Sequence, residues 1–154
     1  MQTHIPATAD LPTMIDRAAR MNDAFMNGRM QEWAALARPS ADFSIMTPFG
    51  GWSSGGFDAT PERLADLARG FPAGTTGIKV IAAHASGDLS LLAVIERQTA
   101  VVHGMPEQDW SLRVTLVFRR NGDDWDLIHR HADPLVQGIS IGQSAALARG
   151  ADPA

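Results

Sequence analysis

The stretch of the chain that decides the fold runs from Trp110 to Leu135 and reads WSLRVTLVFRR (110–120), NGDD (121–124) and WDLIHRHADPL (125–135). Apolar residues at alternate positions from Leu112 to Phe118 predict a β-strand whose two faces meet different surroundings. Asn-Gly at 121–122 is typical of a tight reversal between two strands. The stretch therefore predicts a β-hairpin.

This hairpin resembles the closing hairpin of SnoaL-like and ketosteroid-isomerase-related domains, which belong to the nuclear transport factor 2-like superfamily. The resemblance rests on Arg113-x-Thr115 in the first strand and on RNGxxW (120–125) followed by His129-x-His131 in the second. The second strand also resembles the end of the association domain of calcium/calmodulin-dependent kinase II. The order of the expected elements agrees with the superfamily from about Leu11 to Leu135.

Length and composition predict a single domain with a proper core, because the 154 residues are 45% hydrophobic. The chain carries 13 Lys and Arg against 17 Asp and Glu, and no basic run that could follow a phosphate backbone. Nucleic acid is therefore not an expected partner. The absence of cysteine excludes disulfides and thiolate zinc sites.

The first residues, MQTHIP, lack the basic and apolar regions of a secretory signal. No run approaches the roughly 20 apolar residues that a membrane span needs. We therefore expect a cytoplasmic protein that does not bind membranes.

Helices are predicted before the long strands. Helical spacing and stop signals indicate helices over 12–28, 30–37 and 60–70, and strands over 43–46, 78–85 and 89–102, ahead of the hairpin. This order predicts an α+β fold with helices packed on one face of a curved, mostly antiparallel sheet. The resemblance implies that the sheet is cone-shaped and wraps around the N-terminal helices, as in a cystatin-like roll. We expect an N-terminal extension over 1–10, the SnoaL-like domain over 11–136, and a loosely ordered tail, rich in Gly, Ala and Ser, over 137–154.

The segment from Thr47 to Ala59 is glycine-rich and still carries three large aromatic residues, Phe49, Trp52 and Phe57. One interpretation is a mobile surface connection, and the other is a lid over a pocket, since exposed aromatic rings usually cover something.

In the resembling families the open end of the cone is a small-molecule pocket, mostly apolar with a few polar groups. The resemblance implies that several residues here contact a ligand, although aromatic residues of this kind are also often plain core. The candidates are Trp33, Phe43, Thr47, Phe49, Trp52, Phe57 and Trp110. We expect a ligand that is apolar with one polar end.

Three charged residues are the candidates for catalysis. Glu96 interrupts an apolar run, so a buried carboxylate paired with Arg113 or Arg130 is expected, unless the strand reaches solvent there. Arg113 and Thr115 match the Arg-x-Thr pattern of the family and are placed in or near the pocket. Alternatively, Arg113 pairs with a surface carboxylate such as Glu107 or Asp109.

Two histidines, His129 and His131, share one face of the last strand, and Arg130 occupies the other. They could in principle share a metal, but Asp133 is the only evident third ligand, and the resemblance implies no metal or cofactor. We expect none, and we interpret the histidines as packing at a subunit interface of a homodimer. His131 and Asp133 are also candidates for ligand contact, whereas His84 and His103 are interpreted as ordinary residues.

Ketosteroid isomerase works with an aspartate base, a tyrosine and a protonated aspartic acid. This chain has no tyrosine, Thr47-Pro48 stands where the base should precede a proline, and Arg113 and Thr115 occupy the strand of the acidic donor. Steroid isomerase chemistry is therefore not expected. The sequence favours a SnoaL-like protein that binds a small apolar molecule, with isomerase, cyclase or dehydratase chemistry to be tested. The alternative is a non-catalytic binding or oligomeric association module.

Overall fold

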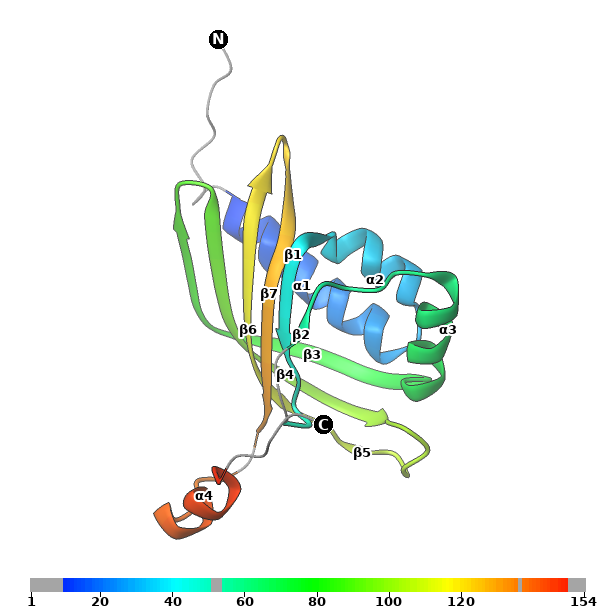
Figure 1. Ribbon diagram of the computed structural model, residues 1–154, viewed down its shortest axis with the longest axis vertical. Coiled ribbons are helices and arrows are strands. Elements are labelled where there is room, and N and C mark those ends of the chain that lie inside the picture. Colours follow the sequence, from blue (N-terminus) through cyan, green and yellow to red (C-terminus); the bar gives the residue numbers. More distant parts are fainter. Residues whose placement is uncertain (1–9, 51–53, 136, 150–154) are drawn as a thin grey trace.

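The computed structural model describes residues 10–50, 54–135 and 137–149 (Figure 1). Its helices are α1 (Leu11–Met26), α2 (Met30–Ala37), α3 (Pro61–Gly70) and α4 (Ile141–Leu147). Its strands are β1 (Pro39–Met46), β2 (Ser54–Gly55), β3 (Ala73–Ser86), β4 (Leu89–Val101), β5 (Gln108–Asp109), β6 (Leu112–Asn121) and β7 (Asp124–Pro134). None of the helices in this described part is long and apolar enough to cross a membrane.

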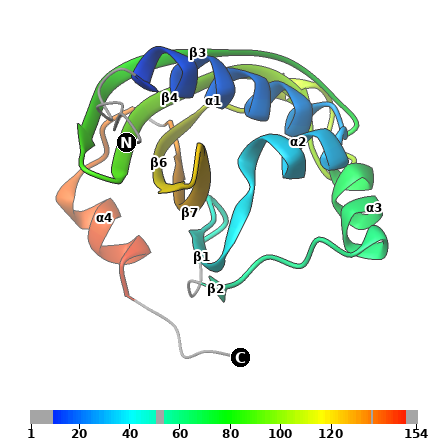
Figure 2. The same ribbon diagram turned by 90° about the horizontal axis from the view of Figure 1, so that it is seen from above.

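The strands form one sheet in the order β2-β1-β7-β6-β4-β3, with β5 added to β4. Only β1 and β7 run parallel, and the other neighbouring strands are antiparallel. Figure 2 shows β3 and β4 arching over α1, with α2 and α3 on the same concave side. The prediction of an α+β fold, with a strongly curved and mostly antiparallel sheet wrapped around N-terminal helices, is confirmed.

Helix α1 is fixed to the sheet by a stripe of apolar side chains and by hydrogen bonds at its C-terminal end. Met14, Ala18 and Met21 recur at helical spacing and are buried against the sheet. Just after the helix, the Asn27 carboxamide donates to the carbonyl of Gly74 at 2.9 Å and accepts from the Gly74 N–H at 3.0 Å. The end of α1 is thereby fixed to the first residues of β3.

The core of the domain lies between α1 and the inner face of β4, β6 and β7. Leu92, Leu116, Phe118 and Leu127 are fully buried there. Their burial closes the middle of the cone, so any cavity must lie nearer one end.

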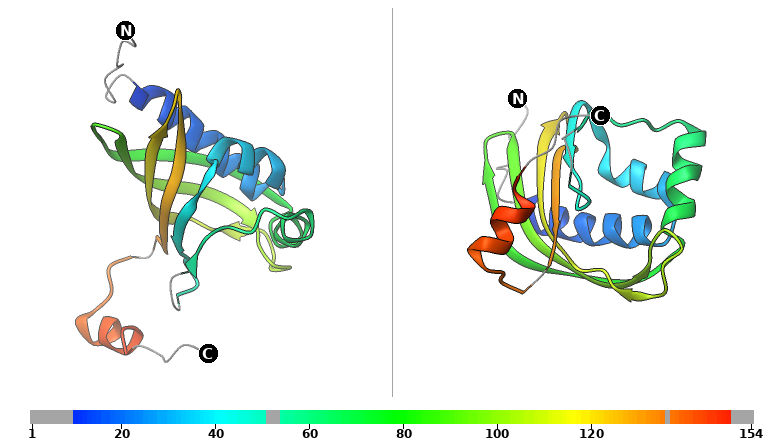
Figure 3. Two further views of the ribbon diagram at one scale, coloured as in Figure 1. Left: turned by 45° about the horizontal axis from the view of Figure 1, so that its top comes forward. Right: turned by 60° about the horizontal axis from the view of Figure 1, so that its bottom comes forward.

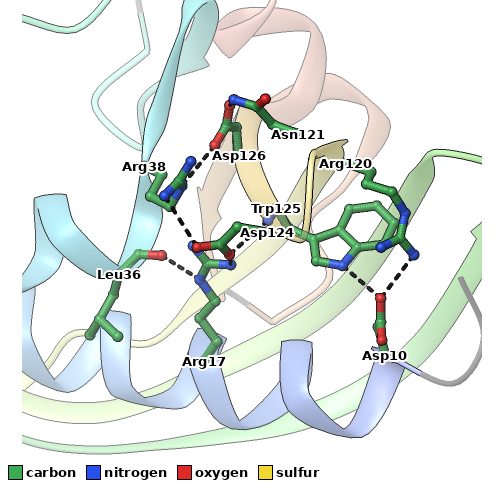
Figure 4. A network of polar contacts seen from close by, with 9 residues as sticks. All are labelled: Asp10, Arg17, Leu36, Arg38, Arg120, Asn121, Asp124, Trp125 and Asp126. Atoms are coloured by element: carbon green, nitrogen blue, oxygen red, sulfur yellow. Dashed lines mark hydrogen bonds and ion pairs between the residues drawn. The ribbon is translucent and has the colours of Figure 1, made fainter. Parts of the chain in front are cut away.

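A network of polar contacts ties the tip of the β6–β7 hairpin to the helices (Figure 4). The Asp10 carboxylate accepts from the Trp125 indole N–H at 2.8 Å and from Arg120 at 3.0 Å. Asp124 pairs with Arg17 at 3.0 Å and with Arg38 at 3.2 Å. These contacts hold the narrow end of the cone, at the hairpin tip.

The C-terminal segment contains a helix that its composition did not predict. Ser140 caps α4 by accepting from the Gln143 N–H, while the Gln143 side chain accepts from the Ser140 N–H, which is a complete capping box. Ile141 and Leu147 are exposed, and Figure 3 shows α4 standing apart from the sheet and the other helices. Local capping therefore accounts for this helix better than packing does.

Candidate functional site

A cavity of about 410 Å³ occupies the wide end of the cone, between the inner face of the sheet and the helices. Its walls are mainly apolar and aromatic, which is typical of a site for a small organic molecule. The lining residues are Ala18, Met21, Asn22, Phe25, Met26, Trp33, Ile45, Thr47, Pro48, Phe49, Gly56, Phe57, Asp58, Arg63, Asp66, Leu67, Phe71, Glu96, His103, Trp110, Leu112, Leu116 and Arg130.

An ion pair between Glu96 and Arg130 lies in the wall of this cavity. The two guanidinium NH2 groups of Arg130 donate to the two carboxylate oxygens of Glu96, each at 2.9 Å. Glu96 is 3% exposed and the Arg130 side chain 21% exposed. The predictions that Glu96 is buried and pairs with an arginine are confirmed, and Arg130 is the partner.

The strand order explains why these two residues meet. Glu96 on β4 lies opposite Leu112 of β6, and Arg130 on β7 lies opposite Leu116 of the same strand. β6 separates the two strands, and the two partners on β6 lie four positions apart, so the Glu96 and Arg130 side chains reach toward each other diagonally across one strand. Shorter side chains at these two positions could not form the pair.

Arg130 carries a permanent positive charge in this site. Burial lowers its pKa, but the charge and the hydrogen bonds of Glu96 outweigh burial, so that the pKa lies above its usual value. The cavity therefore holds a fixed cation with planar N–H donors, and its charge is balanced by the carboxylate beside it.

A β-bulge decides which side chains of β7 face the cavity. Phe118 pairs with Leu127, and Val117 pairs with His129, so Ile128 is the extra residue. Simple alternation from the inward-facing Leu127 would bring His129 inward. The bulge instead turns Arg130 inward, and the prediction that the two histidines share the face opposite Arg130 is confirmed.

Four predicted site residues face away from the cavity, and their placement in the pocket is wrong. Leu112, Val114 and Leu116 of β6 are buried on the inner face, so the residues between them must point outward. Arg113 is accordingly 61% exposed and lies 3.5 Å from Asp133. The outward-facing residues are Arg113, Thr115, His131 and Asp133.

The remaining outward contacts of this region are also local. His131 Nε2 lies 3.3 Å from the Asp133 carboxylate, and the hydroxyl of Ser44 lies 2.7 Å from His129 Nδ1. No group of three His, Cys, Asp or Glu suited to a metal ion occurs among residues 10–50, 54–135 and 137–149.

The aromatic predictions divide into three groups. Trp33, Phe49, Phe57 and Trp110 line the cavity, and so does Thr47. Phe43 does not line it, because its ring is 1% exposed and packs edge-on behind Phe57. Trp52 lies outside the described residues, and the proposal of a lid over the cavity therefore rests on Phe49 and Phe57.

Sequence reasoning missed several polar residues of the cavity, namely Asn22, Asp58, Arg63, Asp66 and His103. The signal for His103 was its place before a glycine in a tight turn, where its φ is +48°. Its imidazole packs edge-on against Phe71, in space that Gly70 leaves free. Asn22 lies on α1 with no local signal, since nothing in the sequence distinguishes it from an exposed helical residue.

Comparison with known proteins gives a family and a set of similar folds. A model of the SnoaL-like domain matches residues 16–137. Among solved structures, a nuclear transport factor 2-like protein from Streptomyces avermitilis, provisionally named a dehydratase, has a TM-score of 0.68 at 19% identity, over 84% of this chain and 99% of its own.

Two further structures share the fold at low identity. A nuclear transport factor 2-like protein with a cystatin-like fold from Novosphingobium aromaticivorans has a TM-score of 0.63 at 16% identity, over 91% of this chain and 90% of its own. The association domain of calcium/calmodulin-dependent kinase II from Caenorhabditis elegans has a TM-score of 0.61 at 13% identity, over 82% of this chain and 97% of its own. No curated protein matches the chain.

Proposed function

The chain belongs to the SnoaL-like domain family, and from that premise we propose that its cavity binds a small, largely apolar molecule with one polar end. The observation that carries the proposal is the buried Glu96–Arg130 pair within otherwise apolar walls. Apolar walls favour burial of a hydrocarbon skeleton, and the pair offers a fixed site for its polar end.

We further propose acid–base chemistry on a carbonyl compound, in which Glu96 acts as the base and Arg130 stabilises negative charge. Each carboxylate oxygen of Glu96 keeps a second lone pair beyond the one that Arg130 occupies, so it can still accept a proton. Glu96 would take a proton from the carbon beside the carbonyl, and Arg130 would donate hydrogen bonds to the enolate oxygen. Return of that proton from Glu96 to a different atom of the enolate gives an isomer. Attack of the enolate carbon on a second carbonyl closes a ring, and the new alkoxide takes the proton from Glu96. Loss of a β-hydroxyl, which takes the proton from Glu96 and leaves as water, gives an unsaturated carbonyl compound, the reaction of a dehydratase.

Steroid isomerase chemistry is not part of this proposal. The chain contains no tyrosine, so the phenol donor of that mechanism is absent. Thr47 lines the cavity beside Pro48, at the position where the resemblance implies the aspartate base. A threonine hydroxyl has no tendency to take up a proton near neutral pH.

A thermal-shift screen tests ligand binding. Apolar carboxylates, steroids and polyketide-like ketones are added to the wild type, to Arg130→Met, and to Arg113→Ala as a control on the outer face. Binding to the native state raises the melting temperature. We expect a hit that is lost in Arg130→Met and kept in Arg113→Ala. A hit lost in Arg113→Ala and kept in Arg130→Met would contradict the proposal.

Turnover tests the catalytic part. For a compound found by the screen, Glu96→Gln removes the base and keeps the shape of the side chain. We expect kcat to fall by about a hundredfold or more, the usual contribution of a general base. Unchanged turnover would refute Glu96 as the base.

A non-catalytic binding module is the second candidate, and one observation favours it. Glu96 already satisfies Arg130 with two hydrogen bonds, so the pair is complete without a substrate. On this alternative a ligand binds without turnover, and Glu96→Gln changes affinity alone.

We infer that a second copy of the chain covers the outer face of the sheet, and that the protein acts in the cytoplasm. Leu91, Ile95 and Val117 are only half-buried on that face, and Met46 of β1, which pairs with His131 of β7, is exposed. One of the similar structures, from calcium/calmodulin-dependent kinase II, is named an association domain. Sedimentation at micromolar concentration should give a dimer, and a purely monomeric result would contradict the inference.

A further inference from the structure

Two buried carboxamides, Asn22 of α1 and Gln98 of β4, form a second polar group beside the Glu96–Arg130 pair. The Asn22 NH2 donates to the Gln98 side-chain oxygen at 2.8 Å. Asn22 is 6% exposed and Gln98 5% exposed. Gln98 follows Glu96 by two residues on the same strand, so both side chains point to the inner face.

This amide pair is incompletely hydrogen-bonded. The Gln98 NH2 is buried and has no partner among the described residues. Within the same residues, the Asn22 side-chain oxygen also takes part in no hydrogen bond. A buried donor without an acceptor costs as much as a lost hydrogen bond, whereas an apolar pair of similar volume would avoid that cost. Stability therefore does not account for the pair, and the unused Asn22 oxygen leaves a hydrogen-bonding position open to a ligand.

The position of Asn22 shows which end of the pair a ligand would meet. Asn22 lines the cavity, next to Met21, Phe25 and Met26, and Gln98 lies behind it. Turning both carboxamides by half a rotation keeps their mutual hydrogen bond and exchanges the donor and the acceptor. Asn22 can thus present either an oxygen or an NH2 group to the cavity, and so can bind a hydroxyl or a carbonyl.

We propose that the Asn22–Gln98 pair is a second polar subsite of the cavity, and that the ligand is an apolar molecule with two oxygen functions. The inference rests on the proposed function, since the first oxygen is the polar end bound by Glu96 and Arg130. Residues two apart on a strand lie about 7 Å from each other. Because Asn22 contacts Gln98, the two oxygens of the ligand should be separated by a distance of the same order.

The first experiment measures Kd for matched probes by calorimetry. The probes are a decalone, the same ring system with a hydroxyl on the second ring, and the dione with a ketone there. A second hydrogen bond should tighten binding by about tenfold. Asn22→Leu should remove this gain, so that the three probes bind the variant with Kd values within about twofold of one another. Arg113→Ala, on the outer face, should keep the gain.

The second experiment needs no ligand and compares the melting temperature of the wild type with that of Asn22→Leu combined with Gln98→Met. Leucine and methionine approximate the shapes of the residues they replace, so if the pair is kept for binding, the double variant should be the more stable protein. A lower melting temperature would show that the pair is structural and would overturn the inference.

The outcomes separate the two proposals. Binding of the plain decalone with no gain from the second oxygen would overturn the inference and leave the proposed function in place. A gain that survives Asn22→Leu would also overturn it. Failure of all three probes and of the wider screen to bind the wild type would overturn both.

Discussion

Two of the arginine–carboxylate pairs of the β6–β7 hairpin lie on opposite faces of one sheet. On the inner face Arg130 forms two hydrogen bonds of 2.9 Å with a buried Glu96. On the outer face Arg113 makes one contact of 3.5 Å with Asp133, and both side chains are largely in solvent. The same residue types thus have different surroundings because side chains at alternate positions of a strand point to opposite faces of the sheet. Of these two pairs, the inner one borders the cavity.

This difference sets the energetic expectations. A buried ion pair is sensitive to the loss of one partner, because the other charge remains out of water. An exposed pair contributes little, since water and salt already screen both charges.

The largest effect is expected from Arg130→Met. This change leaves the Glu96 carboxylate buried without its cation, so the free energy of unfolding should fall by about 3–5 kcal/mol. Urea denaturation at neutral pH measures it, with Arg113→Met as the matched control. Equal losses of unfolding free energy in the two variants would show that the buried pair is no more sensitive to the loss of its arginine than the exposed pair.

A second variant removes both inner charges together. Glu96→Leu combined with Arg130→Met leaves no buried charge, and the free energy of unfolding should be unchanged or rise by about 1–4 kcal/mol. The same denaturation experiment measures this change. If the double variant were as unstable as Arg130→Met alone, the loss would come from packing and the electrostatic explanation would fail.

The hairpin tip offers an intermediate case in Asp124, which is half-exposed and pairs with Arg17 and Arg38. Its burial acts to raise the pKa, but the Trp125 N–H and the two arginine charges outweigh burial and hold the pKa below its usual value. A carboxyl whose folded-state pKa is depressed stabilises the protein above its unfolded pKa, near 3.9, and loses that contribution as the pH falls further.

Asp124→Asn should therefore lower the free energy of unfolding by on the order of 1 kcal/mol at pH 7. The gap between wild type and variant should close as the pH falls below about 4. Denaturation curves at several pH values test this, and a gap that persists at the lowest pH would contradict the assignment.

The smallest effect is expected for Arg113→Ala, at no more than about 1 kcal/mol in low salt. Near 1 M salt the Debye length is about 3 Å, so the effect should vanish there. The effect of Arg130→Met should persist in the same salt. A salt-independent effect of Arg113→Ala would indicate that its contact is not electrostatic.

The sequence predicted the fold well because its strands and turns carry local signals. Three signals each act over a few residues: the alternation in β6, the Asn-Gly turn and the threonine cap before α3. All three features are present in the structure. The short strands β2 and β5 lack such signals and form only through neighbours in the sheet.

The site was harder to predict because it depends on which face of the hairpin is inside. Glu96 was found because a carboxylate in an apolar run must be paired. Arg113 was misplaced because the family pattern was followed instead of the buried Leu112 and Leu116 on either side of it. Asn22 and Gln98 meet across 76 positions of sequence, and no local pattern reveals such a contact.

The most direct test of the central claim is to locate a bound ligand by NMR. A hit from the screen is titrated into labelled protein, and the shifts of backbone amides and of the Arg130 and Trp110 side-chain N–H groups are followed. We predict the largest shifts at Glu96, Arg130 and Trp110, with Arg113 and Asp133 unchanged. Shifts confined to the outer face, around Arg113, His131 and Asp133, would contradict the claim that the inner cavity is the functional site.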